Sequence, residues 1–435
     1  MNSSKNYELP IPEENEPDAV PVTYNRRKVS LGTTVFLVIC AVLITAAVTF
    51  IITVTSTRNQ LGLTNGSVLS RINAKLVAIN EILNDEYVGD IDEDLLVSSA
   101  LKGYMYGLGD RYANYFTAEE YNSNMSDLSG NGVGIGVNLT YNAEHVAIEV
   151  LSVFPDSPAF EAGIKEGDLI AYIYVNGESK SIAELTYEGA LDALIGEKGS
   201  SAEFTVFRGN EHEEILEFSI IRDEYTQYSV FHHLYEIDNT IGFIRITNFD
   251  YNTPEQFKNA IKDLTEQDVR GIILDVRYNL GGEVNSVCKV LDILLPEGTV
   301  LRTVDKKGNE EVLYTSDENE LKLPMAVLVN ESTASAAELF AAALRDYDKA
   351  FLVGTNTYGK GSMQTTIPFG DGTGFKYTSR YYCPPFSDNF DGKGLAPDVE
   401  VELAEELQLM NFFKIMDSDD NQLATAYNEL LKSFN

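Results

Sequence analysis

The sequence has few basic residues, few histidines and no zinc-binding motif. It contains 32 lysines and arginines against 67 aspartates and glutamates, so the formal net charge of its 435 residues is −35. Nucleic-acid phosphates are bound by clustered lysines and arginines, and the composition therefore argues against a nucleic-acid partner. The four histidines lack metal-ligand spacing and no His-Glu-x-x-His occurs, which argues against zinc chemistry. We expect no metal or other cofactor.

Cysteine is also scarce, with Cys40, Cys288 and Cys383 in the whole chain. Cys40 lies in a long apolar run, and the other two are far apart in sequence. One disulfide between Cys288 and Cys383 is compatible with this count, but we expect two buried free thiols. A Gly-x-Ser-x-Gly segment is absent as well, which argues against a Ser-His-Asp hydrolase built on a nucleophile elbow.

Charged residues are absent between Lys28 and Arg58. Residues 1–28 are polar, so we expect a disordered tail there. The apolar run within 29–57 is long enough to span a bilayer as a helix, and the basic residues before it predict a cytoplasmic N-terminus. A cleaved signal peptide is the alternative, but the run is too long and lacks an Ala-x-Ala-like exit. We expect a single-pass cell-membrane protein whose remaining chain is extracytoplasmic.

Residues 58–128 show the apolar spacing of amphipathic helices, for example at Leu76, Ile79 and Leu83. Such helices could pair with a second copy of the chain or pack on their own domain. The sequence does not choose between these arrangements, so a homodimer stays open.

The most informative stretch of the chain surrounds Ser335. An apolar run at 325–329 predicts a strand buried on both faces, and the alanine-rich segment 335–345 predicts a helix. Ser335 therefore lies where a turn becomes a helix. Because the first N–H groups of a helix lack partners within it, the N–H of Ala336 would stabilise an oxyanion formed beside Ser335.

A lysine follows the next predicted strand, which occupies 350–354. A serine hydroxyl is a weak nucleophile, and Lys360 can accept its proton if burial or nearby charge lowers the amine pKa. Gln364 would orient the amine through a hydrogen bond. Taken one at a time, each residue also has a non-catalytic interpretation: Ser335 as a helix N-cap, Lys360 as a solvated loop cation and Gln364 as a surface amide. Together, Ser335, Lys360 and Gln364 indicate a nucleophile, its base and a supporting group.

The segments TASAAE around Ser335 and YGKGSMQ around Lys360 resemble the carboxyl-terminal processing peptidases, also called tail-specific proteases. The resemblance implies a serine endopeptidase with a Ser/Lys dyad. Residues 275–282 are similar to the family segment that supplies a second oxyanion-hole N–H, here Gly281, although Leu280 replaces the usual proline. Further family-like segments stand at 109–121 and 392–403.

Residues 129–222 resemble a PDZ domain, a module that binds an extended C-terminal peptide as an added strand. The likeness lies in the glycine-rich stretch 132–137 and in the segment 157–177. It implies that backbone N–H groups hold the terminal carboxylate of a peptide. The residues of this loop would be Gly134, Ile135 and Gly136.

The other wall of the predicted groove is a helix at 186–195, with Ala190, Leu191 and Leu194 on one face. Relatives often carry an arginine that links peptide occupancy to activity at the position of Ile195. The isoleucine therefore puts such gating in question.

Strands that alternate with helices predict an α/β core for residues 223–403. They include strands at 241–247 and 271–275 and a helix that begins with a capping box at 253–256. Two amphipathic helices are expected in 404–435. The predicted fold class is multidomain α/β: a transmembrane helix, a helical segment, a β-rich PDZ domain and a crotonase-like Ser/Lys peptidase core.

Other functions fit the sequence less well. Gly354 to Lys360 nearly matches a nucleotide-binding P-loop, but Gly361 replaces its Ser or Thr and the next residues read as a strand. The sequence contains elements similar to two of the β-lactamase motifs, but the third motif, Lys-Thr-Gly, is missing. We predict a membrane-anchored extracytoplasmic serine endopeptidase that acts on proteins or peptides with free C-termini. The alternative is a catalytically inactive membrane-tethered PDZ adaptor.

Overall fold

The computed structural model describes residues 31–60, 67–209 and 213–434. The chain separates into two units, residues 1–92 and residues 93–435. The described elements of the first unit are the helices α1 (Leu31–Gln60) and α2 (Val68–Glu86). No helix in the described part of the chain is both long and apolar enough to cross a membrane. The tail predicted at 1–28 lies outside the described residues.

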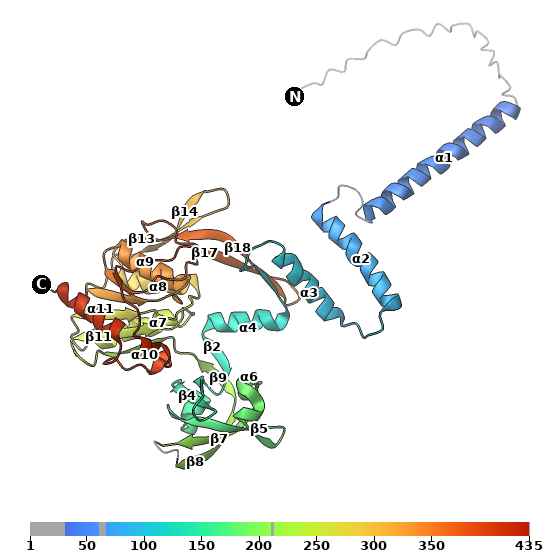
Figure 1. Cartoon of the computed structure of the whole chain (residues 1–435). Coiled ribbons are helices and arrows are strands. Elements are labelled where there is room, and N and C mark those ends of the chain that lie inside the picture. The colour runs from blue at the N-terminus through green and yellow to red at the C-terminus, as the bar shows by residue number, and fades with distance from the viewer. Residues whose placement is uncertain (1–30, 61–66, 210–212, 435) are drawn as a thin grey trace, which may run out of the picture. The chain divides into compact units, whose positions relative to one another are not determined.

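Two helices and one short strand open the second unit (Figure 1): α3 (Glu93–Tyr106), β1 (Asn114–Phe116) and α4 (Ala118–Ser129). A capping box starts α4, because Thr117 Oγ1 accepts from the N–H of Glu120 and the Glu120 carboxylate accepts from the N–H of Thr117. The helical prediction for 58–128 therefore holds for these helices but missed β1.

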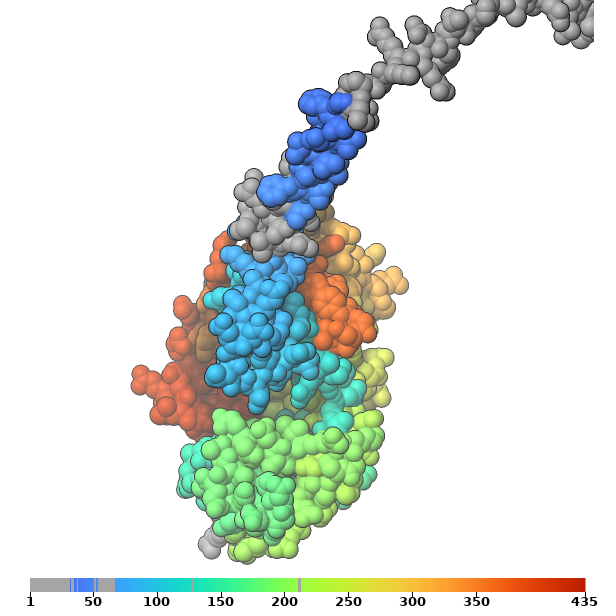
Figure 2. Space-filling view, turned by 90° about the vertical axis from the view of Figure 1, so that its right-hand side faces the viewer, coloured from blue at the N-terminus to red at the C-terminus, as the bar shows by residue number. Residues whose placement is uncertain are grey.

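Residues 131–226 form a compact lobe of antiparallel strands, with its later part coloured green in Figure 2. Its sheet order is β3-β4-β5-β7-β8 with β6 on β5, and a separate pair joins β2 to β9. Ile148, Ile170 and Phe204 are fully buried in its core. The elements are β2 (Asn131–Gly134), β3 (Val137–Asn142), β4 (Ala147–Val153), α5 (Pro158–Ala162), β5 (Leu169–Val175), β6 (Glu178–Ser181), α6 (Ile182–Leu194), β7 (Ser201–Arg208), β8 (Glu214–Ile221) and β9 (Asp223–Thr226).

Helix α6 begins four residues before its predicted start at 186. The Glu184 carboxylate accepts from both the N–H and the hydroxyl of Ser181, at 2.8 Å each, and so caps an additional first turn. Thr186 then has φ 65° and ψ 168°, which kinks the helix at the residue where we expected it to begin.

A mostly parallel sheet forms the second body of this unit, in the order β10-β11-β12-β15-β16-β19. Only β10 runs antiparallel to its neighbour among these described strands. The predicted α/β core is confirmed. The strands are β10 (Val230–Leu234), β11 (Ile241–Ile246), β12 (Gly271–Asp275), β15 (Met325–Val329), β16 (Ala350–Gly354) and β19 (Val399–Glu400).

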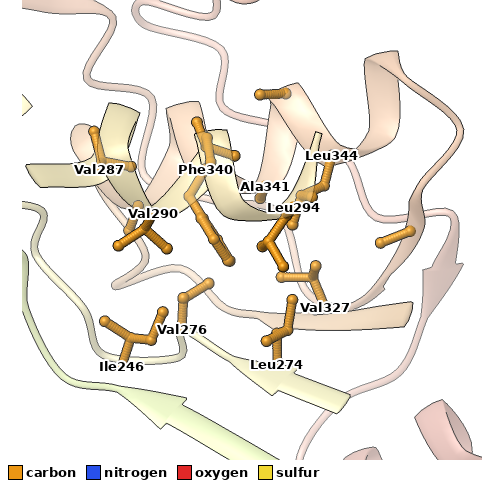
Figure 3. Packing of buried hydrophobic residues seen from close by; sticks show 14 of the residues in the cluster. Ile246, Leu274, Val276, Val287, Val290, Leu294, Val327, Phe340, Ala341 and Leu344 are labelled. Carbon is orange, nitrogen blue, oxygen red and sulfur yellow. The ribbon is translucent and has the colours of Figure 1, made fainter. Parts of the chain in front are cut away.

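The central strands of this sheet are apolar on both faces because helices cover both faces. Leu274 and Val327 pack beneath α8 (Val284–Leu294) and α9 (Ala336–Asp346), where Phe340 points toward the sheet (Figure 3). The buried residues of α7 (Thr253–Thr265) belong to the same core. On the same strands, the neighbouring residues Ile273 and Ala326 pack against α11 (Asn421–Lys432). This two-sided burial explains why 325–329 is a continuous apolar run.

A five-stranded sheet brings distant parts of the chain together, in the order β1-β18-β13-β14 with β17 on β18. Strand β1 pairs with β18 so that Asn114 is opposite Lys376. The family-like segment 109–121 therefore contributes a strand to the sheet that contains β17 and β18, the two strands that follow Lys360 in the chain. The remaining strands are β13 (Gly298–Val304), β14 (Glu310–Ser316), β17 (Ser362–Pro368) and β18 (Gly374–Cys383).

Two predicted helix boundaries need correction. Asn252, not Thr253, is the N-cap of α7, and the Gln256 amide oxygen accepts from the N–H of Ser229 rather than completing a capping box. The first of the two helices expected in 404–435 is a short α10 (Glu405–Gln408) followed by the 3-10 turn η1 (Phe412–Lys414). The Asn411 side chain accepts from the N–H of Phe413 and starts the 3-10 turn as a separate element.

Cys288 and Cys383 are both buried and form no disulfide in the structure, as we predicted. Burial raises the pKa of the Cys288 thiol, and both side chains behave as small apolar groups.

Candidate active site

Ser335 lies at the turn between β15 and α9 with φ 59° and ψ −118°. A positive φ is strained for a residue with a Cβ and persists only where the surroundings fix it. Two hydrogen bonds to the segment after β12 do this. The N–H of Ala334 donates to the carbonyl of Asn279, and the Thr333 hydroxyl donates to the carbonyl of Val276, both at 2.9 Å. The turn thus presents the Ser335 side chain at the start of α9.

Gly281, predicted as an oxyanion-hole donor, packs directly against this turn. Its φ is 103°, and a Cβ there would lie 2.8 Å from Ser335 Cβ and 3.0 Å from the nitrogen of Ala336. The structure therefore brings Gly281, Ser335 and Ala336 together. The Gly281 N–H donates to Asn279 Oδ1 at 2.8 Å, whereas we find no acceptor for the Ala336 N–H among the described residues.

The fully buried carboxylate of Glu338 joins the serine turn to the lysine loop. It accepts from the N–H of Ser335 at 2.9 Å and from the N–H of Lys360 at 2.8 Å. The same carboxylate accepts from the Thr357 hydroxyl at 2.6 Å and from the Gly359 N–H at 2.7 Å. One side chain in the first turn of α9 thereby fixes the backbones of Ser335 and Lys360 relative to each other.

The Lys360 amine lies in a partly buried, aromatic environment. Its Nζ is 4.6 Å from the centroid of the Tyr112 ring, which the segment before β1 supplies. Burial lowers the pKa of Lys360, the positive charges of Lys376 and Arg111 lower it further, and Glu338 opposes this shift. These are the conditions under which a lysine can act as a base, because the ammonium form is disfavoured.

The Ser335 hydroxyl shares a 2.7 Å hydrogen bond with the hydroxyl of Tyr382, a buried residue of β18. We find no hydrogen bond from Ser335 to Lys360 among the described residues. Catalytic hydrogen bonds are often long or poorly aligned before substrate binds and tighten in the complex, so this geometry is compatible with Lys360 as the base.

Gln364 lies on β17, next to the lysine loop. Its amide nitrogen donates to the carbonyl and hydroxyl of Ser362 and to the hydroxyl of Thr378, each at 3.2 Å. We find no hydrogen bond to Lys360 in the described structure, and the orienting role stays a prediction. The strand after Lys360 is confirmed, which removes the P-loop interpretation because that motif needs a helix there.

The sequence profile of peptidase family S41 matches residues 240–401, which include both Ser335 and Lys360. The "Probable CtpA-like serine protease" of Staphylococcus epidermidis is 32% identical over 378 residues, which cover 86% of this chain and 74% of that protein. The chain belongs to peptidase family S41. It is a serine peptidase of the carboxyl-terminal processing, CtpA-like type. The corresponding Staphylococcus aureus protease is 32% identical over 394 residues, 88% of this chain and 76% of that protein.

A solved structure from Bacteroides fragilis, assigned to the S41 proteases, has a TM-score of 0.51 at 15% identity. It covers 82% of this chain and 97% of that one. This likeness supports the S41 fold described above.

The sequence did not point to three residues at this candidate site: Tyr112, Glu338 and Tyr382. Glu338 carried a readable signal, since a serine followed three residues later by glutamate is a capping-box pattern. No local signal marked Tyr382, because its contact with Ser335 depends on how β18 pairs within its sheet. Tyr112 was inside a family-like segment, but nothing in the sequence placed that segment beside Lys360.

The glycine-rich loop predicted to bind a peptide carboxylate begins at Gly134, which is the last residue of β2 and pairs with Asp223 of β9. Ile135 is buried, and its carbonyl accepts from the N–H of Ala159 at 2.8 Å. We find no acceptor for the N–H groups of Ile135 and Gly136 among the described residues. Gly134, Ile135 and Gly136 are all buried in this conformation, so the carboxylate site stays a prediction.

The structure corrects which residues of α6 line the predicted peptide groove. Ala190 and Leu194 are buried in the core of the lobe, so they support the helix rather than contact a ligand. Leu191 is partly buried and is the one predicted wall residue able to touch a peptide in this conformation.

Proposed function

We propose that this S41 peptidase cleaves proteins with Ser335 as nucleophile and Lys360 as general base. The observation that carries the proposal is the Glu338 carboxylate, which binds the N–H of both residues and sets the two turns side by side. In its neutral form the Lys360 amine takes the Ser335 proton while Oγ forms a bond to the scissile carbonyl carbon. The ammonium then returns that proton to the leaving amine, and water hydrolyses the acyl-enzyme.

Two backbone N–H groups would stabilise the oxyanion in this scheme. The Ala336 N–H points from the first turn of α9, and Gly281 lies against Ser335. The Gly281 N–H must first leave Asn279 Oδ1, and the Lys360 amine must move from the Tyr112 ring towards Ser335. We propose that substrate binding assembles this arrangement, with Gln364 orienting the amine.

We further propose that the lobe at 131–226 is a PDZ domain that recruits substrates by their free C-termini. The N–H groups of Ile135 and Gly136, for which we find no acceptor among the described residues, support a carboxylate site at that loop. A peptide added beside β3 would then face α6, where Leu191 and Tyr187 are partly buried. In this proposal the lobe recruits substrates but does not gate catalysis, because Ile195 replaces the arginine that links peptide occupancy to activity in relatives.

The proposed location is the outer face of a cell membrane, with the N-terminus in the cytoplasm. Support comes from the uncharged run between Lys28 and Arg58 and the basic residues before it.

Alanine substitutions test the dyad directly. Ser335→Ala and Lys360→Ala should each lower degradation of denatured casein by about 10³-fold or more, and the double variant should be no worse, because the pair works as a unit. Ser332→Ala in the same turn and Lys289→Ala on the exposed face of α8 are matched controls that should stay active. Activity within a few-fold of wild type in either dyad variant would contradict the assignment, whereas a wild-type protein that does not cleave casein would favour an inactive PDZ adaptor.

A further inference from the structure

The hydroxyl of Tyr382 is a buried polar group at the active site for which the Ser/Lys scheme has no use. Tyr382 is 1% exposed, and its hydroxyl lies 2.7 Å from Ser335 Oγ. Its position is fixed by the backbone, because the Tyr382 N–H donates to the carbonyl of Gly361 and its own carbonyl accepts from the Asn389 amide. The ring also packs against Phe390, with centroids 5.8 Å apart. The phenol is therefore held rigidly beside the nucleophile.

The direction of this hydrogen bond follows from the available partners. Ser335 Oγ is the one partner we find for the Tyr382 hydroxyl among the described residues. If Ser335 were the donor, the buried Tyr382 proton would have no acceptor, and an unpaired buried donor is costly. The Tyr382 O–H therefore donates to Ser335 Oγ and leaves the Ser335 proton for Lys360. Burial raises the pKa of Tyr382, so the phenol stays protonated and cannot itself act as a base.

We propose that Tyr382 is a further catalytic residue that donates a hydrogen bond to the Ser335 oxygen as negative charge develops on it. This inference rests on the proposed role of Ser335 as nucleophile. Charge builds on Oγ when Lys360 removes the proton and again when the acyl group leaves during hydrolysis. A hydrogen bond to a charged acceptor is stronger than one to a neutral hydroxyl, so the Tyr382 bond strengthens towards both transition states. Interactions of this kind raise kcat rather than substrate affinity.

The test is Tyr382→Phe, which removes one oxygen and keeps the ring. Tyr235→Phe is the matched control, since Tyr235 is also fully buried and lies in the core on the α11 side of the parallel sheet. Its hydroxyl has no hydrogen-bond partner among the residues that the structure describes. Purified full-length variants are treated with a fluorophosphonate, whose reaction with serine needs no peptide binding. We expect Tyr382→Phe to be labelled at Ser335 about 10- to 100-fold more slowly than wild type, and casein kcat to fall similarly with KM unchanged. Tyr235→Phe should match wild type in both.

The pH dependence of labelling separates this role from others. The midpoint of the rate against pH should be the same in wild type and Tyr382→Phe, because Lys360 remains the base, while the plateau falls. A shifted midpoint with an unchanged plateau would overturn the inference, since Tyr382 would then act on Lys360. Labelling of Tyr382→Phe as fast as wild type would also overturn it but leave Ser335 as nucleophile. If the wild type is not labelled at Ser335 and Ser335→Ala still cleaves casein, the proposed function fails and the inference fails with it.

Discussion

At the scale of single residues, the site depends on backbone conformations that few side chains tolerate. Ser335 has a positive φ, and Gly281 approaches it so closely that no Cβ fits between them. The sequence marked both residues, because a serine before an alanine-rich helix and a glycine pair after a buried strand are local patterns. The sequence did not reveal that the Gly281 N–H donates a hydrogen bond to the Asn279 side chain, because that bond depends on the conformation of the folded loop.

Gly281→Ala should abolish activity while the chain still folds. The new Cβ would lie 2.8 Å from Ser335 Cβ and 2.9 Å from the carbonyl oxygen of Ala334, so the serine turn must shift. Gly308→Ala is the control, because Gly308 has φ 80° with open space around it and carries the same φ strain without the clash. Casein cleavage should fall by about 100-fold or more in Gly281→Ala alone. Equal activities in the two variants would show that Gly281 does not shape the site.

The charge of Lys376 should set the pH range of the enzyme. Burial, Lys376 and Arg111 all lower the pKa of Lys360, so the neutral amine and hence the rate should rise with pH and then level off. Removing the positive charge in Lys376→Met should raise the pKa of Lys360 and move the rise to higher pH. Lys289→Met on the surface of α8 should leave the profile in place. The measurement is kcat from acid to alkaline pH for the wild type and both variants. A Lys376→Met profile that moves to lower pH would contradict the electrostatic account.

At the scale of elements, the sequence predicted the parallel strands well. The strands β12, β15 and β16 are short apolar runs because both faces of their sheet are covered, and this burial is visible in composition. The pairing of β1 with β18 was not predictable, because it joins residues that are far apart in the chain and depends on tertiary packing. That pairing brings Tyr112 to Lys360, and β18 itself carries Tyr382, which is why both residues were missed.

Glu338 should stabilise the junction of α9 with the lysine loop. Glu338→Ala would leave four donors without their acceptor, three of them in buried hydrogen bonds, and we expect a loss of about 3 kcal/mol or more in the free energy of unfolding. Glu255→Ala on the exposed surface of α7 should change this free energy by less than about 1 kcal/mol, because surface ion pairs contribute little. Urea unfolding of both variants measures the difference. A Glu338→Ala protein as stable as Glu255→Ala would mean that other contacts hold the two turns.

At the scale of the whole molecule, the lobe at 131–226 should determine which proteins are cleaved. A peptide with a free C-terminus should have a lower KM than the same peptide amidated, because amidation removes the carboxylate that the N–H groups of Ile135 and Gly136 would bind. Its kcat should be unchanged if the lobe only recruits. Equal KM values for the two peptides would show that the loop does not read the terminus and that the PDZ resemblance is one of fold alone.

The central claim is that Ser335 forms the covalent intermediate with Lys360 as its base, and mass spectrometry of the fluorophosphonate adduct tests it most directly. We predict one adduct in the wild-type protein, on the peptide that contains Ser335. The adduct should be absent from Ser335→Ala and should form much more slowly in Lys360→Ala. An adduct on another residue, or an unlabelled Ser335 in a protein that still cleaves casein, would contradict the account.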